Sequence, residues 1–230
     1  MRFLWVFIGF LLLILSISSC RDIVARKRIK EGIIKYEIKY DSITSKKLDT
    51  RLLPSSLIVR FKDNNTLNTI DAFSGAISIS MISNHTTQQF VTMVKVFNKK
   101  LYHEEPNANK YPALYSRIPT VKIVSNDEPC KLLGYNCYKA KGCFTDQPDS
   151  EFEIIYTKEI DINNPNINTP FEGIDGVMLR FNLRINSLMM ELNAQSVKRS
   201  KIPDETFAIP NDYTPVDFQT ITDLIYLLQQ

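Results

Sequence analysis

The chain has little glycine, little histidine and little excess charge. Only 7 of its 230 residues are glycine, so a glycine-rich phosphate-binding loop is not expected. Its 28 basic and 25 acidic residues give a net charge of +3, without the strong basic excess typical of nucleic-acid-binding proteins. Neither a G-x-S-x-G elbow nor an H-E-x-x-H helix is present. We therefore expect a protein that is not an enzyme, needs no cofactor or metal, and does not bind nucleic acid.

The chain has two histidines, His85 and His103. His85 lies in a predicted turn, where Asn84 and Thr86 also fit a glycosylation acceptor, and we favour the turn alone. His103 precedes Glu104 and Glu105, which could form a metal site or hold a general base. A solvated strand end is the favoured interpretation of that second cluster.

The chain also has no apolar run long enough to cross a bilayer as a helix. Its longest, residues 3–15, covers thirteen positions after a positively charged start, whereas a spanning helix needs about 20. A short apolar run that ends in small residues is typical of a secretory signal peptide. The exit Ile17-Ser18-Ser19-Cys20 resembles the lipobox of bacterial lipoproteins, which implies cleavage after residue 19 and a lipid on Cys20. Alternatives are an ordinary signal peptide cut near Ser19, or an uncleaved anchor.

The resemblance to lipoproteins implies a location. Arg21, and not aspartate, follows the cysteine, which implies the outer membrane of a Gram-negative bacterium, with the protein on the periplasmic side. Residues 20–30 are rich in basic side chains and are interpreted as a solvated tether, with contact to anionic headgroups as the alternative. Residues 31–230 fit one domain.

The domain reads mainly as strands with a C-terminal helix. Residues 32–40 alternate apolar and charged side chains, which predicts a strand with one wet face, and residues 177–185 repeat the pattern. Residues 161–169, rich in Asn and Pro, predict a surface loop. Residues 217–230 have helical spacing, with Asp217 as the cap. Further strands are predicted at 56–62, 67–73, 76–83, 88–97, 101–103, 135–140, 151–156 and 188–197, a hairpin turn at 186–187, and a short edge strand within 203–213.

Three segments in order carry a family resemblance. Leu132-Leu133-Gly134-Tyr135-Asn136-Cys137-Tyr138-Lys139-Ala140 comes first, then a strand that ends in Tyr156 and Thr157, then Phe171-Glu172-Gly173-Ile174-Asp175-Gly176-Val177-Met178. This order resembles the GLPGLI family of bacterial envelope proteins, although Asp175 replaces its proline. The matching residues are Gly134, Tyr135, Cys137, Lys139, Ala140, Tyr156, Thr157, Gly173 and Gly176.

The resemblance extends to the lipoprotein-carrier (LolA/LolB-like) fold and implies an architecture. That fold is a curved, open antiparallel sheet, or half-barrel, with a few helices covering its concave face, and its hollow binds acyl chains. By this resemblance the fold class is mainly β (α+β). The glycines and Asp175 are interpreted as structural and not catalytic.

The last candidate site is a disulfide bond. With Cys20 acylated, Cys130, Cys137 and Cys143 could form at most one disulfide, and all three pairings stay open. Cys130–Cys137 is preferred, with a bend at Gly134. The spacings of 7 and 6 do not match zinc ligands.

Two functional hypotheses follow. The first is a membrane-anchored envelope lipoprotein that binds a lipid or acyl chain in the hollow of its sheet. The second is a non-enzymatic structural or interaction lipoprotein with a closed core, which binds another envelope component.

Overall fold

A computed structural model describes residues 28–41, 49, 53–105, 111–116, 118–185 and 188–228. The predicted signal peptide, Cys20 and most of the tether lie outside these residues. The predicted hairpin turn at 186–187 lies outside them as well.

The described chain folds mainly into strands, joined by short turns and three 3₁₀ helices, and followed by one α-helix. The elements are β1 (Glu31–Tyr40), β2 (Ser56–Lys62), β3 (Asn65–Ala72), η3 (Phe73–Gly75), β4 (Ile77–Asn84), β5 (Gln89–Val96), β6 (Lys99–Glu105), η4 (Ala113–Tyr115), β7 (Val121–Leu132), β8 (Tyr135–Phe144), β9 (Gln147–Thr157), β10 (Val177–Ile185), β11 (Leu188–Arg199), η5 (Asp204–Phe207), β12 (Thr214–Pro215) and α3 (Phe218–Leu227).

All described strands belong to one open sheet, which confirms the mainly-β class. The strand order is β12-β6-β5-β4-β3-β2-β1-β11-β10-β9-β8-β7. Strand β1 therefore lies in the middle and joins two meanders, β2–β6 and β7–β11. Every pair is antiparallel except β12 with β6, so the sheet is mixed and the purely antiparallel prediction is wrong at that edge.

Strand β1 shows why this sequence forms a sheet. Ile34, Tyr36 and Ile38 are buried, while the charged residues between them are exposed. Side chains alternate across a strand, so one face of β1 is apolar and the other is wet. On the apolar face Tyr36 is paired with Leu57 of β2 and Ala194 of β11. The pattern read from the sequence therefore sets which face carries the core.

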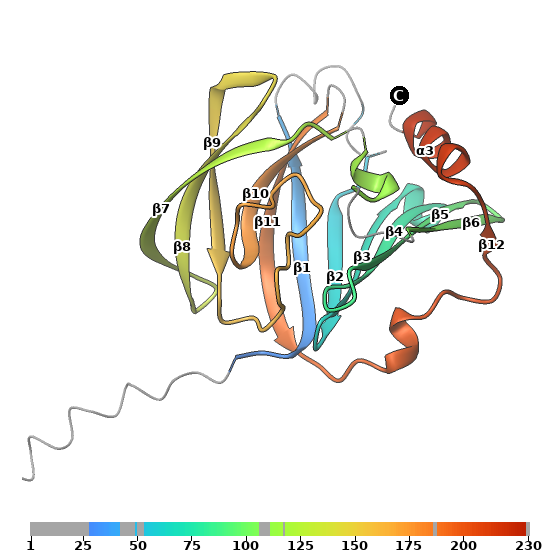
Figure 1. Ribbon diagram of the computed structural model, residues 1–230, viewed down its shortest axis with the longest axis horizontal. Coiled ribbons are helices and arrows are strands. Elements are labelled where there is room, and N and C mark those ends of the chain that lie inside the picture. The colour runs from blue at the N-terminus through green and yellow to red at the C-terminus, as the bar shows by residue number, and fades with distance from the viewer. Residues whose placement is uncertain are drawn as a thin grey trace, which may run out of the picture.

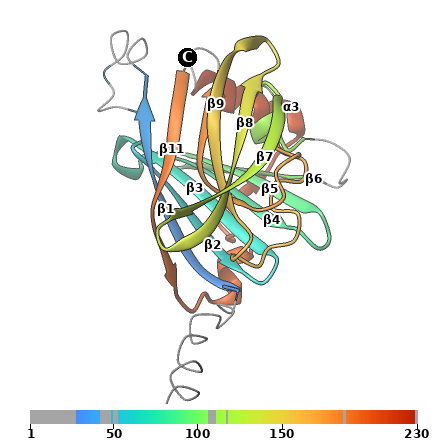
Figure 2. The ribbon, with the colours of Figure 1, turned by 90° about the vertical axis from the view of Figure 1, so that its left-hand side faces the viewer.

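The sheet twists along its width. In Figure 1 strands β7–β11 stand upright on the left, whereas β3–β6 run across to the right. Figure 2, turned by 90°, shows β8 and β9 upright in front of β2–β5, which run obliquely behind them. Right-handed twist is the ordinary property of strands, and it accumulates over a sheet this wide.

The C-terminal helix α3 packs on the β5–β6 end of the sheet (Figure 1). Its Ile221 and Ile225 are buried against Val94 and Leu101. Each such aliphatic side chain contributes about 1.5–3 kcal/mol when fully buried. The predicted cap is confirmed, because the Asp217 carboxylate accepts a hydrogen bond of 2.8 Å from the Thr220 amide.

Two segments differ from the sequence predictions. Strand β7 was not predicted, because its stretch Ser125-Asn126-Asp127-Glu128-Pro129 is polar and contains proline. It is an edge strand, where proline is tolerated since no neighbour needs its amide. Within 203–213 the expected edge strand is wrong; η5 lies there, and the edge strand β12 follows it.

Residues 28–30, assigned to the tether, pack on the domain. Ile29 is buried and forms a parallel bridge with Ile160. Arg28 and Lys30 lie 3.5 and 3.6 Å from the Asp161 carboxylate. The folded domain therefore includes the last residues of the basic segment.

Candidate functional site

The apolar face of the sheet borders a partly open cavity of about 150 Å³. Strands β1–β5, β10 and β11 line one side, and η4 and the chain between β9 and β10 line the other. Apolar side chains dominate the lining, among them Val59, Ile79, Met81, Phe90, Phe181 and Leu183. Among the described residues, no lysine, arginine, aspartate or glutamate lines it. The cavity therefore suits an uncharged, largely apolar group.

Side chains alternate between the two faces of a strand, and this alternation places the lining residues on one face of the sheet. Leu57 and Val59 of β2 are separated by one position, as are Ile79 and Met81 of β4. Register aligns them across the sheet, since Leu57 faces Ile70 of β3, which faces Ile79. Residues far apart in the chain thereby form one continuous apolar wall.

Irregular chain, and not the predicted helices, forms most of the cover over the cavity in the described residues. The segment 158–176, drawn in orange between β9 and β10 in Figure 1, contributes Ile162, Asn166 and Phe171. The loop predicted at 161–169 is present, but it lies only partly on the surface: Asn163 and Asn164 are exposed, whereas Asn166 and Thr169 are only 6% and 8% exposed. The Asn166 side-chain amide donates to the carbonyls of Ile174 and Gly176, at 2.8 and 2.9 Å. Those bonds satisfy buried backbone groups and fold the segment onto the sheet.

Two tyrosines line the cavity. The Tyr36 hydroxyl donates a 2.7 Å hydrogen bond to the Met178 carbonyl. Burial raises the pKa of Tyr36 far above its ordinary value, and it raises the pKa of Tyr115 to about 12. Removal of water disfavours the charged phenolate, which is why burial raises both pKa values.

His85 and Ser83 form a polar corner in the same lining. His85 is 8% exposed and Ser83 is 1% exposed. The His85 Nε2 atom lies 3.2 Å from the Thr66 hydroxyl. Burial lowers the pKa of His85 to about 4, against a smaller opposing effect of the Asn164 carbonyl, so the ring is neutral at pH 7. The turn predicted here is confirmed, but the burial of His85 was missed.

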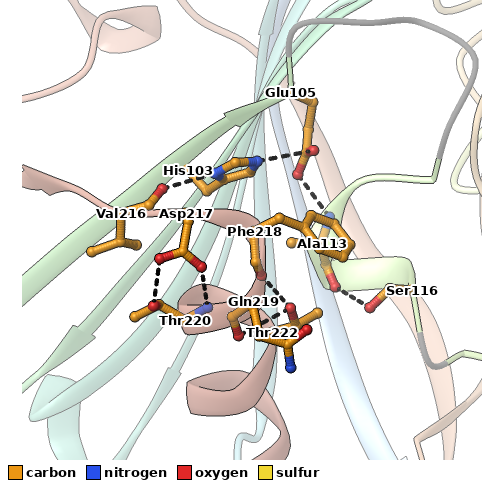
Figure 3. Close-up of polar contacts among 10 residues, drawn as sticks. All are labelled: His103, Glu105, Ala113, Ser116, Val216, Asp217, Phe218, Gln219, Thr220 and Thr222. Carbon is orange, nitrogen blue, oxygen red and sulfur yellow. Dashed lines mark hydrogen bonds and ion pairs between the residues drawn. The ribbon is translucent and has the colours of Figure 1, made fainter.

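The second histidine forms a separate cluster at the C-terminal edge of the sheet (Figure 3). His103 Nδ1 lies 2.8 Å from the Val216 carbonyl, and Nε2 lies 3.4 Å from the Glu105 carboxylate. The other Glu105 oxygen accepts a 2.8 Å hydrogen bond from the Ala113 amide. The solvated strand end predicted here is wrong, because Glu105 is only 7% exposed. We call these residues the His103–Glu105 cluster; it joins β6 to η4 and to the segment before α3.

The first part of the family-like motif lies in the β7–β8 hairpin. Gly134, at φ +80°, forms the turn, a conformation that favours glycine. In β8, Tyr135, Cys137 and Lys139 share the face opposite to that of buried Ala140. The Lys139 ammonium donates to Glu128 at 3.1 Å. These contacts are structural, and none of the five matching residues lines the cavity.

The rest of the motif lies around the end of β9. Buried Thr157 donates its hydroxyl to the Asn136 carbonyl at 2.8 Å, and the Tyr156 hydroxyl donates to Asp127 at 2.7 Å. A Cβ at Gly176 would lie 2.7 Å from the Thr157 carbonyl oxygen, so this close approach requires glycine. Gly173 has ordinary van der Waals space beside Ile123.

The structure brings the preferred cysteine pair together. Cys130 of β7 and Cys137 of β8 are direct register partners across the Gly134 turn, and both are free thiols in the structure. Cys143 is paired instead with Lys122. The Cys130–Cys137 disulfide stays a prediction; free alkylation of Cys130 in the unreduced protein would contradict it.

Among the described residues, no group of three or more His, Cys, Asp or Glu side chains is arranged to hold a metal ion. No described helix has both the length and the apolar content to span a membrane.

Comparisons with known proteins identify the fold. No family model and no curated protein matches the chain. Among solved structures, the chain is similar to PNGF-II in its C2 crystal form, with a TM-score of 0.53 and 18% identity over 85% of this chain. The P21 form of PNGF-II gives a TM-score of 0.55 and 17% identity over 86% of this chain. The chain spans about a third of the length of those proteins, 32% and 33%. At this identity the likeness shows the fold alone.

Proposed function

We propose that the chain is a membrane-anchored envelope lipoprotein that binds a small hydrophobic ligand in the hollow of its sheet. The observation that carries the proposal is the apolar cavity, whose lining holds no charged side chain among the described residues. Apolar cavities with few polar groups are typical of ligand sites. The anchor is the lipid predicted on Cys20, and the location is the periplasmic side of the outer membrane.

In this proposal the sheet works as a half-barrel of the lipoprotein-carrier type. Its twist, and the cover supplied by η4, the 158–176 segment and α3, support that interpretation. Relationship to the GLPGLI family is part of the proposal. It is supported by the tight packing at Gly176 and by the turn at Gly134, because both explain why the motif has glycine at these positions.

The cavity volume limits the ligand. A dry apolar cavity of about 150 Å³ binds a molecule the size of benzene, whereas drug-sized ligands occupy roughly 300–1,000 Å³. The cavity of about 150 Å³ therefore accommodates one ring or one end of an alkyl chain. A whole acyl chain would require the cover to move.

The polar corner of the cavity lies near the start of the folded chain. The His85 amide donates to the Asn64 carbonyl at 2.8 Å, and the adjacent Asp63 amide donates to the Lys30 carbonyl at 2.6 Å. A lipid on Cys20 would attach only ten residues before Lys30. Such a tether would keep this end of the cavity close to the membrane surface.

The small volume also favours a second candidate. A structural or interaction lipoprotein needs no ligand, and its core would simply be closed apart from this space. In that case the outer face of the sheet, with ion pairs such as Lys139–Glu128, would meet another envelope component.

Native mass spectrometry of the full chain after gentle extraction distinguishes the two functions. We expect a co-purifying small apolar molecule in the first case and the bare protein mass in the second. Cys20→Ala tests the anchor separately: the variant should leave the membrane fraction, and an unchanged membrane fraction at unchanged size would contradict lipidation.

A further inference from the structure

Two buried polar atoms at one corner of the cavity lack partners. Among the described residues, neither Ser83 Oγ nor His85 Nδ1 makes a hydrogen bond of ordinary geometry, and the Asn164 carbonyl acts on the His85 ring only weakly. Both side chains are more than nine-tenths buried and both line the cavity. A buried polar group without a partner costs about 1–3 kcal/mol, so such atoms in a cavity wall point to a group that pairs with them.

Three other polar side chains of the lining are already paired. The Asn166 amide and the Thr169 hydroxyl bond to backbone groups of the cover. The Tyr36 hydroxyl bonds to the Met178 carbonyl. Among the described residues, Ser83 Oγ and His85 Nδ1 are the lining atoms that are both fully buried and without a partner.

The chemistry of this corner selects the partner group. The His85 ring is neutral at pH 7, because burial lowers its pKa to about 4. An ionised ligand would lose its hydration and meet no opposite charge, which is costly in an apolar site. Nδ1 donates in one tautomer of the ring and accepts in the other, depending on whether Nε2 accepts from Thr66 or donates to it. A hydroxyl can donate and accept, so it fits both tautomers.

We propose that the ligand is a small uncharged molecule with one hydroxyl on an apolar body, and that this hydroxyl bonds to Ser83 Oγ and His85 Nδ1. The inference rests on the proposed ligand-binding function and defines the class of ligand. The apolar body occupies the space beside Met81 and Met178, which line the same cavity.

Phenol and toluene test the inference, because they are similar in size and only phenol carries a hydroxyl. The full chain, in lipid nanodiscs free of detergent, is labelled with ¹⁵N-histidine and ¹³C-methyl methionine. The methyl groups of Met81 and Met178 report occupancy of the cavity by either probe. The ring nitrogens of His85 report the polar contact, and His103 lies outside the lining and serves as an internal control.

We expect both probes to shift the two methyl resonances and only phenol to shift His85 Nδ1. Ser83→Ala should weaken phenol binding about tenfold, the effect of one hydrogen bond, and leave toluene binding unchanged. Thr92→Val is the matched control: the Thr92 hydroxyl is also buried and unpartnered among the described residues, but it does not line the cavity. That variant should alter neither affinity.

The outcomes separate the inference from the function it rests on. If neither probe shifts Met81 or Met178, the cavity does not bind ligands and the proposed function fails. If both probes shift the methyl groups but His85 does not respond and Ser83→Ala binds phenol normally, only the inference fails. That second result would mean that water satisfies the polar corner.

Discussion

The two histidines lie in polar clusters of opposite character on the same sheet. In the His103–Glu105 cluster, each ring nitrogen and each carboxylate oxygen has a partner, and the contacts cross from β6 to η4 and to the segment before α3. At the polar corner, Ser83 Oγ and His85 Nδ1 have no partner among the described residues. One cluster is complete within the chain, and the other is not.

The difference separates two uses of buried polar groups. A complete network fixes how segments distant in the sequence pack, because each lost contact would leave a buried group unpaired. The His103–Glu105 cluster does this for the C-terminal segment, whose Val216 carbonyl it holds. An incomplete pair lowers stability and is useful only if something else completes it. The contrast predicts opposite responses to mutation and to pH.

The largest effect should come from acidification. The pKa of His85 is about 4 in the folded protein and 6.5 is the ordinary value, so the unfolded chain binds more protons between those pH values. Stability contributed by the neutral ring is complete above pH 6.5 and is lost as the pH falls towards 4. The shift corresponds to up to about 3 kcal/mol, measured by urea unfolding of the full chain at a series of pH values.

His85→Gln provides the control for this titration. The variant keeps a polar side chain without a titrating ring, so its stability should depend less steeply on pH between 6.5 and 4. Carboxylates elsewhere titrate in both proteins and cancel in the difference. Identical pH profiles for the two proteins would show that folding does not lower the pKa of His85.

A smaller loss should follow when the complete cluster is broken. Glu105→Ala removes the acceptor of the Ala113 amide and the partner of His103, and both are left in a buried setting. The expected cost is about 2 kcal/mol of unfolding free energy. Hydrogen exchange should also quicken in α3, because the segment before it is held by His103.

Glu104→Ala is the matched control on the same strand. Glu104 is exposed and lies on the opposite face of β6, so its removal should change stability by less than about 0.5 kcal/mol. Equal losses for the two variants would contradict the importance of the cluster.

The fold class could be predicted because the strands are amphipathic. In β1 the buried residues Ile34, Tyr36 and Ile38 alternate with exposed charged ones, and that period is visible in the sequence. Strand β7 was missed because Pro129 and its polar neighbours resemble a loop, and only its edge position makes them compatible with a strand. Composition also misplaced Asn166, since an asparagine that bonds buried carbonyls looks the same in sequence as one that bonds water.

The candidate site could not be predicted to the same degree. Its walls come from strands that are adjacent only after β1 has joined the two meanders. Ser83 and His85 are two positions apart at the end of a predicted strand, which was a usable signal that they share a face. Whether their polar atoms find partners depends on Thr66 and on the cover, and local sequence does not contain that information.

The smallest expected effect tests the contrast most directly, because the two variants should change the unfolding free energy in opposite directions. Ser83 and Ser80 are both buried in β4, but Ser80 donates its hydroxyl to Thr69 at 3.2 Å, whereas Ser83 Oγ has no partner among the described residues. In the ligand-free protein, Ser83→Ala should raise the unfolding free energy by about 1 kcal/mol, since it removes an unpaired buried hydroxyl. Ser80→Ala should lower it by a similar amount, since it leaves the Thr69 hydroxyl without its donor. Urea unfolding of the two variants measures the difference, and a loss of stability in both would show that Ser83 is already paired, for instance by water.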